Sequence, residues 1–137
     1  MLRSVAGYSG TPLARKLQIK EHSRLLLSGA PEGFAIPDLP DGVAAHRRAG
    51  LEPYDTILLF TSSRADAARR FTPATERLTV AGGVWMCWPK KASGIATDVT
   101  DNVLREIGLA TEFVDVKVCA IDETWSGLRF VRRREHR

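Results

Sequence analysis

The chain has 137 residues, of which 44% are hydrophobic and 26% are charged. This size and composition are typical of one globular domain, which buries enough surface to fold without a disulfide or a metal. No apolar run approaches the ~20 residues of a membrane span, and residues 1–7 lack the apolar core of a secretory signal. We therefore expect a cytoplasmic protein with no membrane partner, one domain over 1–137 and a folded core over 7–133.

The formal net charge of +4 comes from the C-terminal end of the chain. Residues 129–137 hold five arginines against one glutamate, and the rest of the chain is neutral overall. Because a nucleic-acid-binding domain carries its basic residues on a face of the fold, a nucleic-acid partner is not expected. Residues 134–137 are instead predicted to be a frayed, solubilising basic tail. The alternative is RNA binding through this tail, with a steep salt dependence.

The N-terminal half shows two strands and one short helix. Thr11 is a good N-cap and Pro12 suits the first helical position, so a helix is predicted there. Residues 23–28 contain three consecutive leucines, which indicate a strand buried on both faces. Residues 34–53 are rich in turn residues, with a brief edge strand near their middle, at 43–46. The clearest strand in the chain runs from Tyr54 to Phe60.

A helix is predicted after this strand. Ser63 with Asp66 three residues later resembles a capping box, which indicates the beginning of the helix. Proline disrupts a helix interior, so the helix is expected to end or kink near Thr72-Pro73. A second helical piece over 73–78 is then expected to stop before Gly82-Gly83.

The C-terminal half is predicted to alternate in the same way. Residues 84–88 are an apolar strand closed by proline. Thr100 is expected to cap a helix whose C-terminal cap is Gly108. Residues 113–121 and 128–132 then form a hairpin with a long tip.

Strands that alternate with helices favour right-handed βαβ units and a parallel sheet. The fold class expected is therefore α/β. It is a three-layer sandwich with helices on both faces of a mostly parallel, Rossmann-like sheet, closed by a C-terminal antiparallel β-hairpin.

Ligands of open α/β sheets bind outside the carboxyl ends of the strands. A distinctive polar or aromatic loop follows each of four predicted strands, so all four loops are expected along one edge. The candidate ligand-binding residues in these loops are Glu32, Gly33, Ser62, Arg64, Trp88, Lys90, Lys91, Ser93, Asp122, Glu123 and Trp125.

Each candidate also has a structural alternative. The two lysines offer point charges to a phosphate or carboxylate, or form a solvated pair. The two tryptophans stack on a planar ligand, or fill the core and its rim. The acidic pair of the hairpin tip serves as acid and base, or simply as tip charges. Glu32 contacts a ribose or caps a turn, and the serines are mainly helix caps.

Several familiar chemistries are absent from the sequence. There is no phosphate-binding loop of the Walker type, no complete GxGxxG fingerprint and no nucleophile elbow. His22, His46 and His136 have no ligand spacing with the cysteines, so no metal site is predicted. Cys87 and Cys119 each fall in an apolar strand-like run and are interpreted as buried free thiols.

Three segments resemble the class I (Rossmann-like) methyltransferases: residues 54–60, residues 77–83 and the end of the hairpin at 130–133. The resemblance implies S-adenosylmethionine as cofactor, bound by a glycine-rich turn after the first strand and an acidic residue that closes the second. Here the turn carries Pro31 where a backbone N–H is needed, and no acid follows an apolar strand in 34–53. The residues themselves therefore predict no cofactor.

A closer similarity covers roughly residues 7–133. The strings at 7–13, 30–34, 88–94 and 114–128 resemble a small uncharacterised bacterial family, a domain of unknown function. This resemblance implies a stand-alone cytoplasmic protein of this size, and it carries no activity.

The function expected is therefore binding of a small anionic or nucleotide-like molecule at the carboxyl edge, without an assigned reaction. One alternative is methyl transfer with a degenerate cofactor loop, which is also the kind of enzyme we expect if there is catalysis. Another alternative is an interaction or regulatory module that binds a protein partner or a second copy of the chain.

Overall fold

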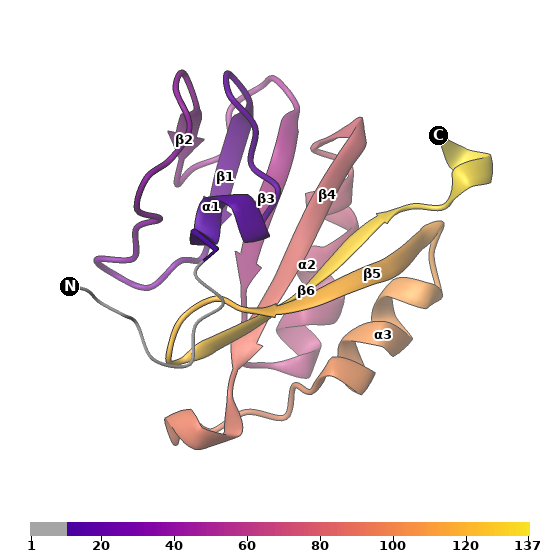
Figure 1. Cartoon of the computed structure of the whole chain (residues 1–137). Coiled ribbons are helices and arrows are strands. Elements are labelled where there is room, and N and C mark those ends of the chain that lie inside the picture. The colour runs from indigo at the N-terminus through magenta and orange to yellow at the C-terminus, as the bar shows by residue number, and fades with distance from the viewer. Residues whose placement is uncertain (1–10) are drawn as a thin grey trace.

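The computed structural model describes residues 11–137, in which helices flank a single sheet (Figure 1). The helices are α1 (Leu13–Lys16), α2 (Arg64–Thr75) and α3 (Asp101–Leu109), with short 3-10 turns η1 (Lys91–Ser93) and η2 (Arg134–His136). The strands are β1 (Arg24–Ser28), β2 (Ala44–His46), β3 (Tyr54–Phe60), β4 (Leu78–Pro89), β5 (Phe113–Ala120) and β6 (Trp125–Arg132). Residues 7–10, where the expected folded core begins, lie outside the described residues.

The order of the strands across the sheet is β2-β1-β3-β4-β6-β5. Strands β1 to β4 pair in parallel, whereas β6 is antiparallel to both of its neighbours, so β5 runs in the same direction as β4. This arrangement confirms the mostly parallel sheet with a C-terminal antiparallel hairpin. From β1 the chain goes outward to β2 and then returns to β3 on the other side of β1. The topological switch point, where such sheets bind ligands, therefore lies between β1 and β3.

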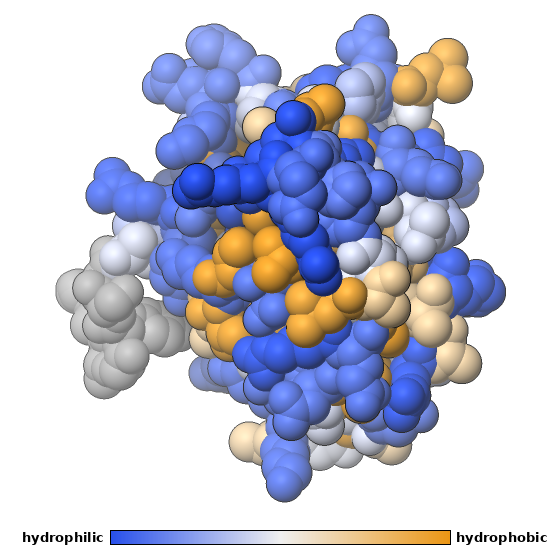
Figure 2. Space-filling view, turned by 90° about the vertical axis from the view of Figure 1, so that its right-hand side faces the viewer, coloured by the Kyte–Doolittle hydropathy of each residue, from blue (hydrophilic) through white to orange (hydrophobic). Residues whose placement is uncertain are grey.

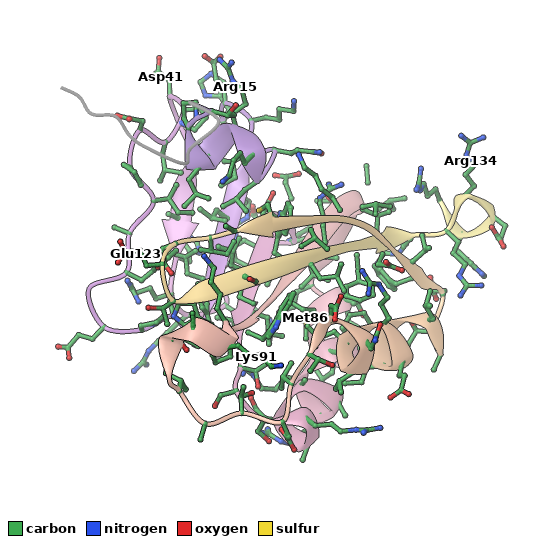
Figure 3. The ribbon with its side chains drawn as sticks, turned by 60° about the horizontal axis from the view of Figure 1, so that its bottom comes forward. Arg15, Asp41, Met86, Lys91, Glu123 and Arg134 are labelled. Atoms are coloured by element: carbon green, nitrogen blue, oxygen red, sulfur yellow. The ribbon has the colours of Figure 1, made fainter. Side chains whose placement is uncertain are left out.

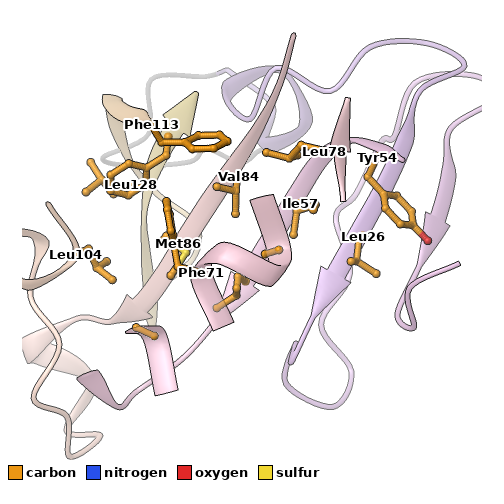
Figure 4. Close-up of a cluster of buried hydrophobic side chains, with 14 of the residues drawn as sticks. Leu26, Tyr54, Ile57, Phe71, Leu78, Val84, Met86, Leu104, Phe113 and Leu128 are labelled. Carbon is orange, nitrogen blue, oxygen red and sulfur yellow. The ribbon is translucent and has the colours of Figure 1, made fainter. Parts of the chain in front are cut away.

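One face of the sheet is covered by α2 and α3, which lie behind it in Figure 1. Phe71 of α2 and Leu104 of α3 pack on Met86 and Leu128 in the larger buried cluster, and all four are almost fully buried (Figure 4). Phe71 also makes an edge-to-face contact with Phe130, with ring centroids 5.3 Å apart. These contacts form the main core.

The opposite face is covered by α1 and by the loop between β1 and β2. Leu17 and Trp85 are fully buried there, and the Trp85 indole donates a hydrogen bond to the Leu17 carbonyl at 3.2 Å. The expected helices on both faces are thus present, but among residues 11–137 the helical cover of this second face is the short helix α1. The N-cap of that helix is Pro12, one residue after the predicted Thr11.

Two predicted helix caps are confirmed. The Ser63 hydroxyl accepts a hydrogen bond from the Asp66 N–H at 3.1 Å, and the Thr100 hydroxyl accepts one from the Val103 N–H at 3.2 Å. Each side chain satisfies a donor that has no partner inside its helix.

The prediction for residues 73–83 was wrong. Helix α2 continues through Pro73, and β4 begins at Leu78, where a second helical piece was expected. Strand pairing explains the difference, because Leu78 pairs with Tyr54 and the register then slips before Gly83 pairs with Thr56. A side chain on Gly82 would meet the Asp55 carbonyl oxygen at 3.0 Å, so glycine here permits close approach of strands and marks no turn.

Gly108 was also misassigned, because the C-cap of α3 is Ala110. A Cβ atom at Gly108 would lie 2.2 Å from Cε2 of the fully buried Phe130. The glycine is therefore explained by the packing of α3 on β6.

The hairpin tip is shorter than predicted, since β6 already begins at Trp125. One Asp122 carboxylate oxygen accepts the N–H groups of Thr124 and Trp125, both at 2.8 Å, and this closes a tight turn.

Two arginines ahead of the expected tail belong to the fold. Arg132 donates to the Thr79 carbonyl at 2.8 Å, and Arg133 donates to the Leu109 carbonyl at 3.1 Å. The concentration of positive charge near the C-terminus is thus partly built into the sheet and its surroundings.

The cysteines are free, as predicted. Cys87 is buried and Cys119 is partly buried, and burial raises the pKa of both thiols. Both residues pair with Gly127 from opposite sides, so they lie two strands apart. This separation is about 10 Å, too far for a disulfide.

Candidate functional site

The carboxyl ends of β1, β3, β4 and β5 lie on one edge of the sheet, as the topology requires. Hydrogen bonds connect the loops of this edge. The Lys90 N–H donates to the Thr124 carbonyl at 2.8 Å, which joins the loop after β4 to the hairpin turn. The Thr97 hydroxyl donates to the Ser62 carbonyl at 2.6 Å, which joins the segment before α3 to the loop after β3. The four loops therefore share an edge, as expected.

The charged candidates of this edge are mostly at the surface. Lys91, Asp122 and Glu123 are exposed, and Lys90 is half-buried. Lys91 and Glu123 both lie at the loop side of the molecule, away from Arg134 at the other end (Figure 3). Asp122 acts as the turn-closing acceptor described above. The structure thus gives Asp122 a structural role, and ligand binding by the other three stays a prediction.

The remaining candidates do not meet in one cavity. Glu32 and Gly33 are exposed, and Gly33 has a φ of 81°. The exposed Arg64 forms an ion pair with Glu106 at 3.2 Å, and its N–H donates to an Asp98 carboxylate oxygen. The Ser93 hydroxyl donates to the Lys90 carbonyl at 2.6 Å.

The two tryptophans fill the rim of the core. Trp88 packs against the larger buried cluster, on the face covered by α2 and α3. Trp125 packs on the opposite face, where its ring makes an edge contact with Phe60 at 5.1 Å, and Phe60 contacts Phe34 at 4.9 Å. Because the two indoles lie on opposite faces, they do not flank a common ligand.

A hollow of about 390 Å³ lies beside the switch point, between α2 and the carboxyl halves of β1 and β3. We call it the arginine hollow. Its floor is apolar and its rim is cationic. The lining comprises Leu26, Ser28, Arg47, Ala49, Leu59, Arg69, Arg70, Pro73, Ala74 and Arg77. No acidic side chain is among these residues.

Arg70 bridges β1 and β3, the two neighbouring strands on either side of the switch point. Its guanidinium donates to the Ser28 hydroxyl at 3.0 Å and to the Phe60 carbonyl at 2.8 Å. It also pairs with Asp66, one helical turn earlier, at 2.7 Å. These bonds hold a positive charge at the carboxyl ends of β1 and β3.

Within residues 11–137, Asp66 is the one carboxylate that forms ion pairs with the arginines of the hollow. It also forms an ion pair with Arg69 and accepts a hydrogen bond from the buried Thr61 hydroxyl at 2.8 Å. Burial acts to raise the pKa of the Asp66 carboxyl, but the hydrogen bonds from Arg70 and Thr61, together with the positive charges of Arg70 and Arg69, lower the pKa overall. Asp66 therefore stays ionised and neutralises one of the neighbouring guanidinium charges.

The other rim arginines are exposed. Arg47 donates to the Phe34 carbonyl, whereas the Arg77 side chain has no hydrogen bond or ion pair with any described residue. With one acid among four arginines, the arginine hollow keeps an excess of positive charge.

Sequence reasoning missed these arginines. The Asp66–Arg70 spacing of four residues is visible in the sequence, but it is equally typical of a solvated helix face. Arg47 comes from the poorly legible segment between β1 and β3, and only the crossing of the chain at the switch point brings it near α2.

Gly29 is the turn residue that follows β1, with a φ of 71°. A Cβ atom there would lie 2.9 Å from Nη2 of Arg70 and 3.1 Å from the Phe60 carbonyl oxygen. Gly29 therefore supplies both the left-handed backbone of the turn and the space for Arg70.

These residues do not fit the cofactor that the methyltransferase resemblance implies. The resemblance implies an acidic residue that closes the second strand, whereas Arg47 and Arg48 follow β2 here. The approach to Gly29 is filled by the Arg70 guanidinium. S-adenosylmethionine carries a sulfonium cation, which a hollow with four arginines and no acid in its lining disfavours.

Comparison with known proteins supports the fold. No family model matches the chain, and no curated protein matches it. The closer resemblance, to an uncharacterised bacterial family, therefore stays a prediction. Among solved structures, a Methanococcus jannaschii fibrillarin pre-rRNA processing protein is similar, with a TM-score of 0.61 and 15% identity over 83% of this chain and 68% of its own.

Two further structures are similar at low identity. TrmN from Thermus thermophilus has a TM-score of 0.62 and 11% identity over 88% of this chain, which spans 47% of that protein. The O-methyltransferase from Bacillus cereus, solved with SAH, has a TM-score of 0.55 and 11% identity over 88% of this chain and 79% of its own. Because identities this low establish architecture alone, we conclude that the chain has the Rossmann-like α/β fold that is also found in methyltransferases.

Proposed function

We propose that the chain binds a small molecule with more than one anionic group in the arginine hollow. The observation that carries this proposal is the excess of guanidinium charge around an apolar floor at the switch point of the sheet. As in the hypothesis from the sequence, the ligand is anionic and binds at the carboxyl edge. The charged contacts are now assigned to the rim arginines in place of Lys90 and Lys91.

The chemistry of the lining defines the class of ligand. Guanidinium groups bind phosphate and carboxylate through paired N–H donors, and several of them favour a ligand with separate anionic groups. Leu26, Leu59 and Ala74 offer a floor for an apolar or planar body. A nucleoside diphosphate or a phosphorylated metabolite has both features. Binding alone requires no catalytic group, so the proposal assigns no reaction.

The test compares two pairs of charges on the full chain. ADP, pyrophosphate and citrate are titrated by calorimetry into the unaltered protein, an Arg47→Met/Arg77→Met variant and a Lys90→Ala/Lys91→Ala variant. Loss of two exposed charge-assisted contacts of roughly 1 kcal/mol each is expected to weaken binding at least tenfold. The lysine variant serves as the matched control and should bind as the unaltered protein does.

Two results contradict the proposal. One is the lack of saturable binding of every anion at millimolar concentration. The other is full affinity in the arginine variant together with loss of affinity in the lysine variant, which would support the original assignment to the β4 loop.

A second candidate function is S-adenosylmethionine-dependent methyl transfer, favoured by the fold shared with the methyltransferases of known structure. Calorimetry with S-adenosylmethionine and with its demethylated product tests this candidate directly. Saturable heats that survive the Arg47→Met/Arg77→Met substitutions would favour it over the anion-binding proposal.

A further inference from the structure

Two further hollows lie on the face of the sheet that carries α1, beyond the part that α1 covers. The first, of about 490 Å³, crosses the beginnings of β1, β3 and β4. The second, of about 330 Å³, continues over β4, β6 and β5. Gln18, Ala81 and Arg129 line both, so the two hollows form one groove that is separate from the arginine hollow.

Arg129 lies at the centre of this groove. Its guanidinium lies directly over Gly83 of the neighbouring strand, where a Cβ atom would be 2.7 Å from Nε and 2.8 Å from Cζ. Because residue 83 is glycine, the guanidinium packs against the backbone of β4 in a half-buried position.

No acceptor on the described chain satisfies this charge. Arg129 forms no hydrogen bond or ion pair with any residue in 11–137, whereas Arg132, three positions further along β6, binds the carbonyls of Thr79 and Thr75. Residues 1–10 contain no aspartate or glutamate. An unpaired guanidinium that is half-buried is unfavourable, so an external anion would be stabilised there.

The surroundings of Arg129 add positive charge. Lys117 pairs with Arg129 in the β5–β6 register, and Arg137 lines the second hollow. Burial, with the like charge of Arg137, lowers the pKa of Arg129, yet a guanidinium stays protonated. The acids of the groove, Glu21 and Asp55, line only the first hollow, and Asp55 already accepts the Arg24 N–H at 2.8 Å.

Beside these charges, part of the lining of the second hollow is apolar. Val80, Ala81, Val116 and Val131 line it, and Val80 and Val116 are 61% and 49% exposed. Figure 2, which looks onto the side formed by β5, shows hydrophobic surface interrupted by hydrophilic side chains. An exposed apolar strip beside an unsatisfied cation matches a ligand with both parts.

We propose that this groove is a second binding site, which takes a carboxylate with an aliphatic chain. The carboxylate pairs with the Arg129 guanidinium, whose planar N–H fork fits two carboxylate oxygens, and the chain lies along Val80, Val116 and Val131. The site is independent of the arginine hollow and of whether that hollow binds an anion.

The test uses octanoate as the probe and the full, isotope-labelled chain. Octanoate is expected to shift the amide resonances of Gly83 and Val131 saturably, and Arg129→Met is expected to weaken its binding at least tenfold. Arg134→Met is the matched control, because Arg134 is an exposed arginine outside the groove. Acetate lacks the chain and octylamine carries the opposite charge, so both should bind at least tenfold more weakly than octanoate.

Stability provides a second readout. Without ligand, Arg129→Met should unfold at a higher temperature than the unaltered protein, because a neutral side chain of similar length replaces an unpaired charge. Octanoate should raise the unfolding temperature of the unaltered protein and leave that of Arg129→Met unchanged. If Arg129→Met does not fold, Lys117→Met is used, with a smaller loss of about threefold expected. Equal octanoate affinity in the substituted and unaltered proteins, or no saturation at millimolar octanoate, would overturn the proposal.

Discussion

Replacement of Gly29 by alanine tests whether the turn after β1 is built around Arg70. Gly29→Ala and the control Gly33→Ala both place an alanine in the left-handed region, since φ is 71° at Gly29 and 81° at Gly33. The left-handed backbone conformation, which is unfavourable for alanine, destabilises each variant by roughly 1–2 kcal/mol. At Gly33 nothing lies within 4 Å of the added Cβ, so no further loss is expected there.

At Gly29 the added Cβ must displace Arg70, because the backbone carbonyl of Phe60 cannot move without disturbing β3. The displaced guanidinium loses its hydrogen bonds to Ser28 and to that carbonyl. At roughly 1 kcal/mol for each bond, Gly29→Ala should be less stable than Gly33→Ala by about 2 kcal/mol. Urea unfolding followed by tryptophan fluorescence measures the difference.

The two glycines should also differ in their response to loss of Arg70. In an Arg70→Met background the excess loss at Gly29 should shrink to less than about 1 kcal/mol, because the bonds that it breaks are already gone. Equal destabilisation by Gly29→Ala and Gly33→Ala in the unaltered protein would refute the argument. An excess loss that persists in the Arg70→Met background would show that contact with Arg70 is not its cause.

Three further predictions concern ionisation and packing. Asp66→Asn should destabilise the protein at neutral pH, and the loss of unfolding free energy should shrink as the pH falls below about 4, because the stabilisation due to a lowered carboxyl pKa is lost as Asp66 protonates. Urea titrations at several pH values measure this loss. A loss that does not depend on pH would argue against the ion pairs of Asp66. Gly108→Ala should destabilise by about 1–3 kcal/mol despite the better helix propensity of alanine, and by less in a Phe130→Leu background; stabilisation by Gly108→Ala alone would exclude the close contact with Phe130. Cys87, with its raised thiol pKa, should react with a disulfide reagent at pH 8 only after unfolding, and rapid reaction in the native state would show that the residue is accessible.

Local sequence signals predicted the structure correctly where one short-range interaction dominates. Ser63 and Thr100 were identified as caps because a cap depends on a hydrogen bond three residues away. The Leu25–Leu27 run was identified as a buried strand because three consecutive apolar residues in a short segment suit a strand that is covered on both faces. Gly82 and Gly108 misled the prediction, since their role is to let a neighbouring strand or ring approach closely, and that neighbour is distant in the sequence.

The sequence by itself determined the class of fold and the edge at which the loops gather. Alternation of strands and helices is a local property, and parallel connections place the strand ends together whatever their loops contain. Only the tertiary structure decided which charged side chains line the same hollow or groove. Arg47 lines the same hollow as Arg70 and Arg77 because the chain crosses from β2 to β3, and Arg129 is held over Gly83 by strand pairing across the sheet. Such juxtapositions depend on register and on side-chain packing between distant segments, which no short stretch of sequence encodes.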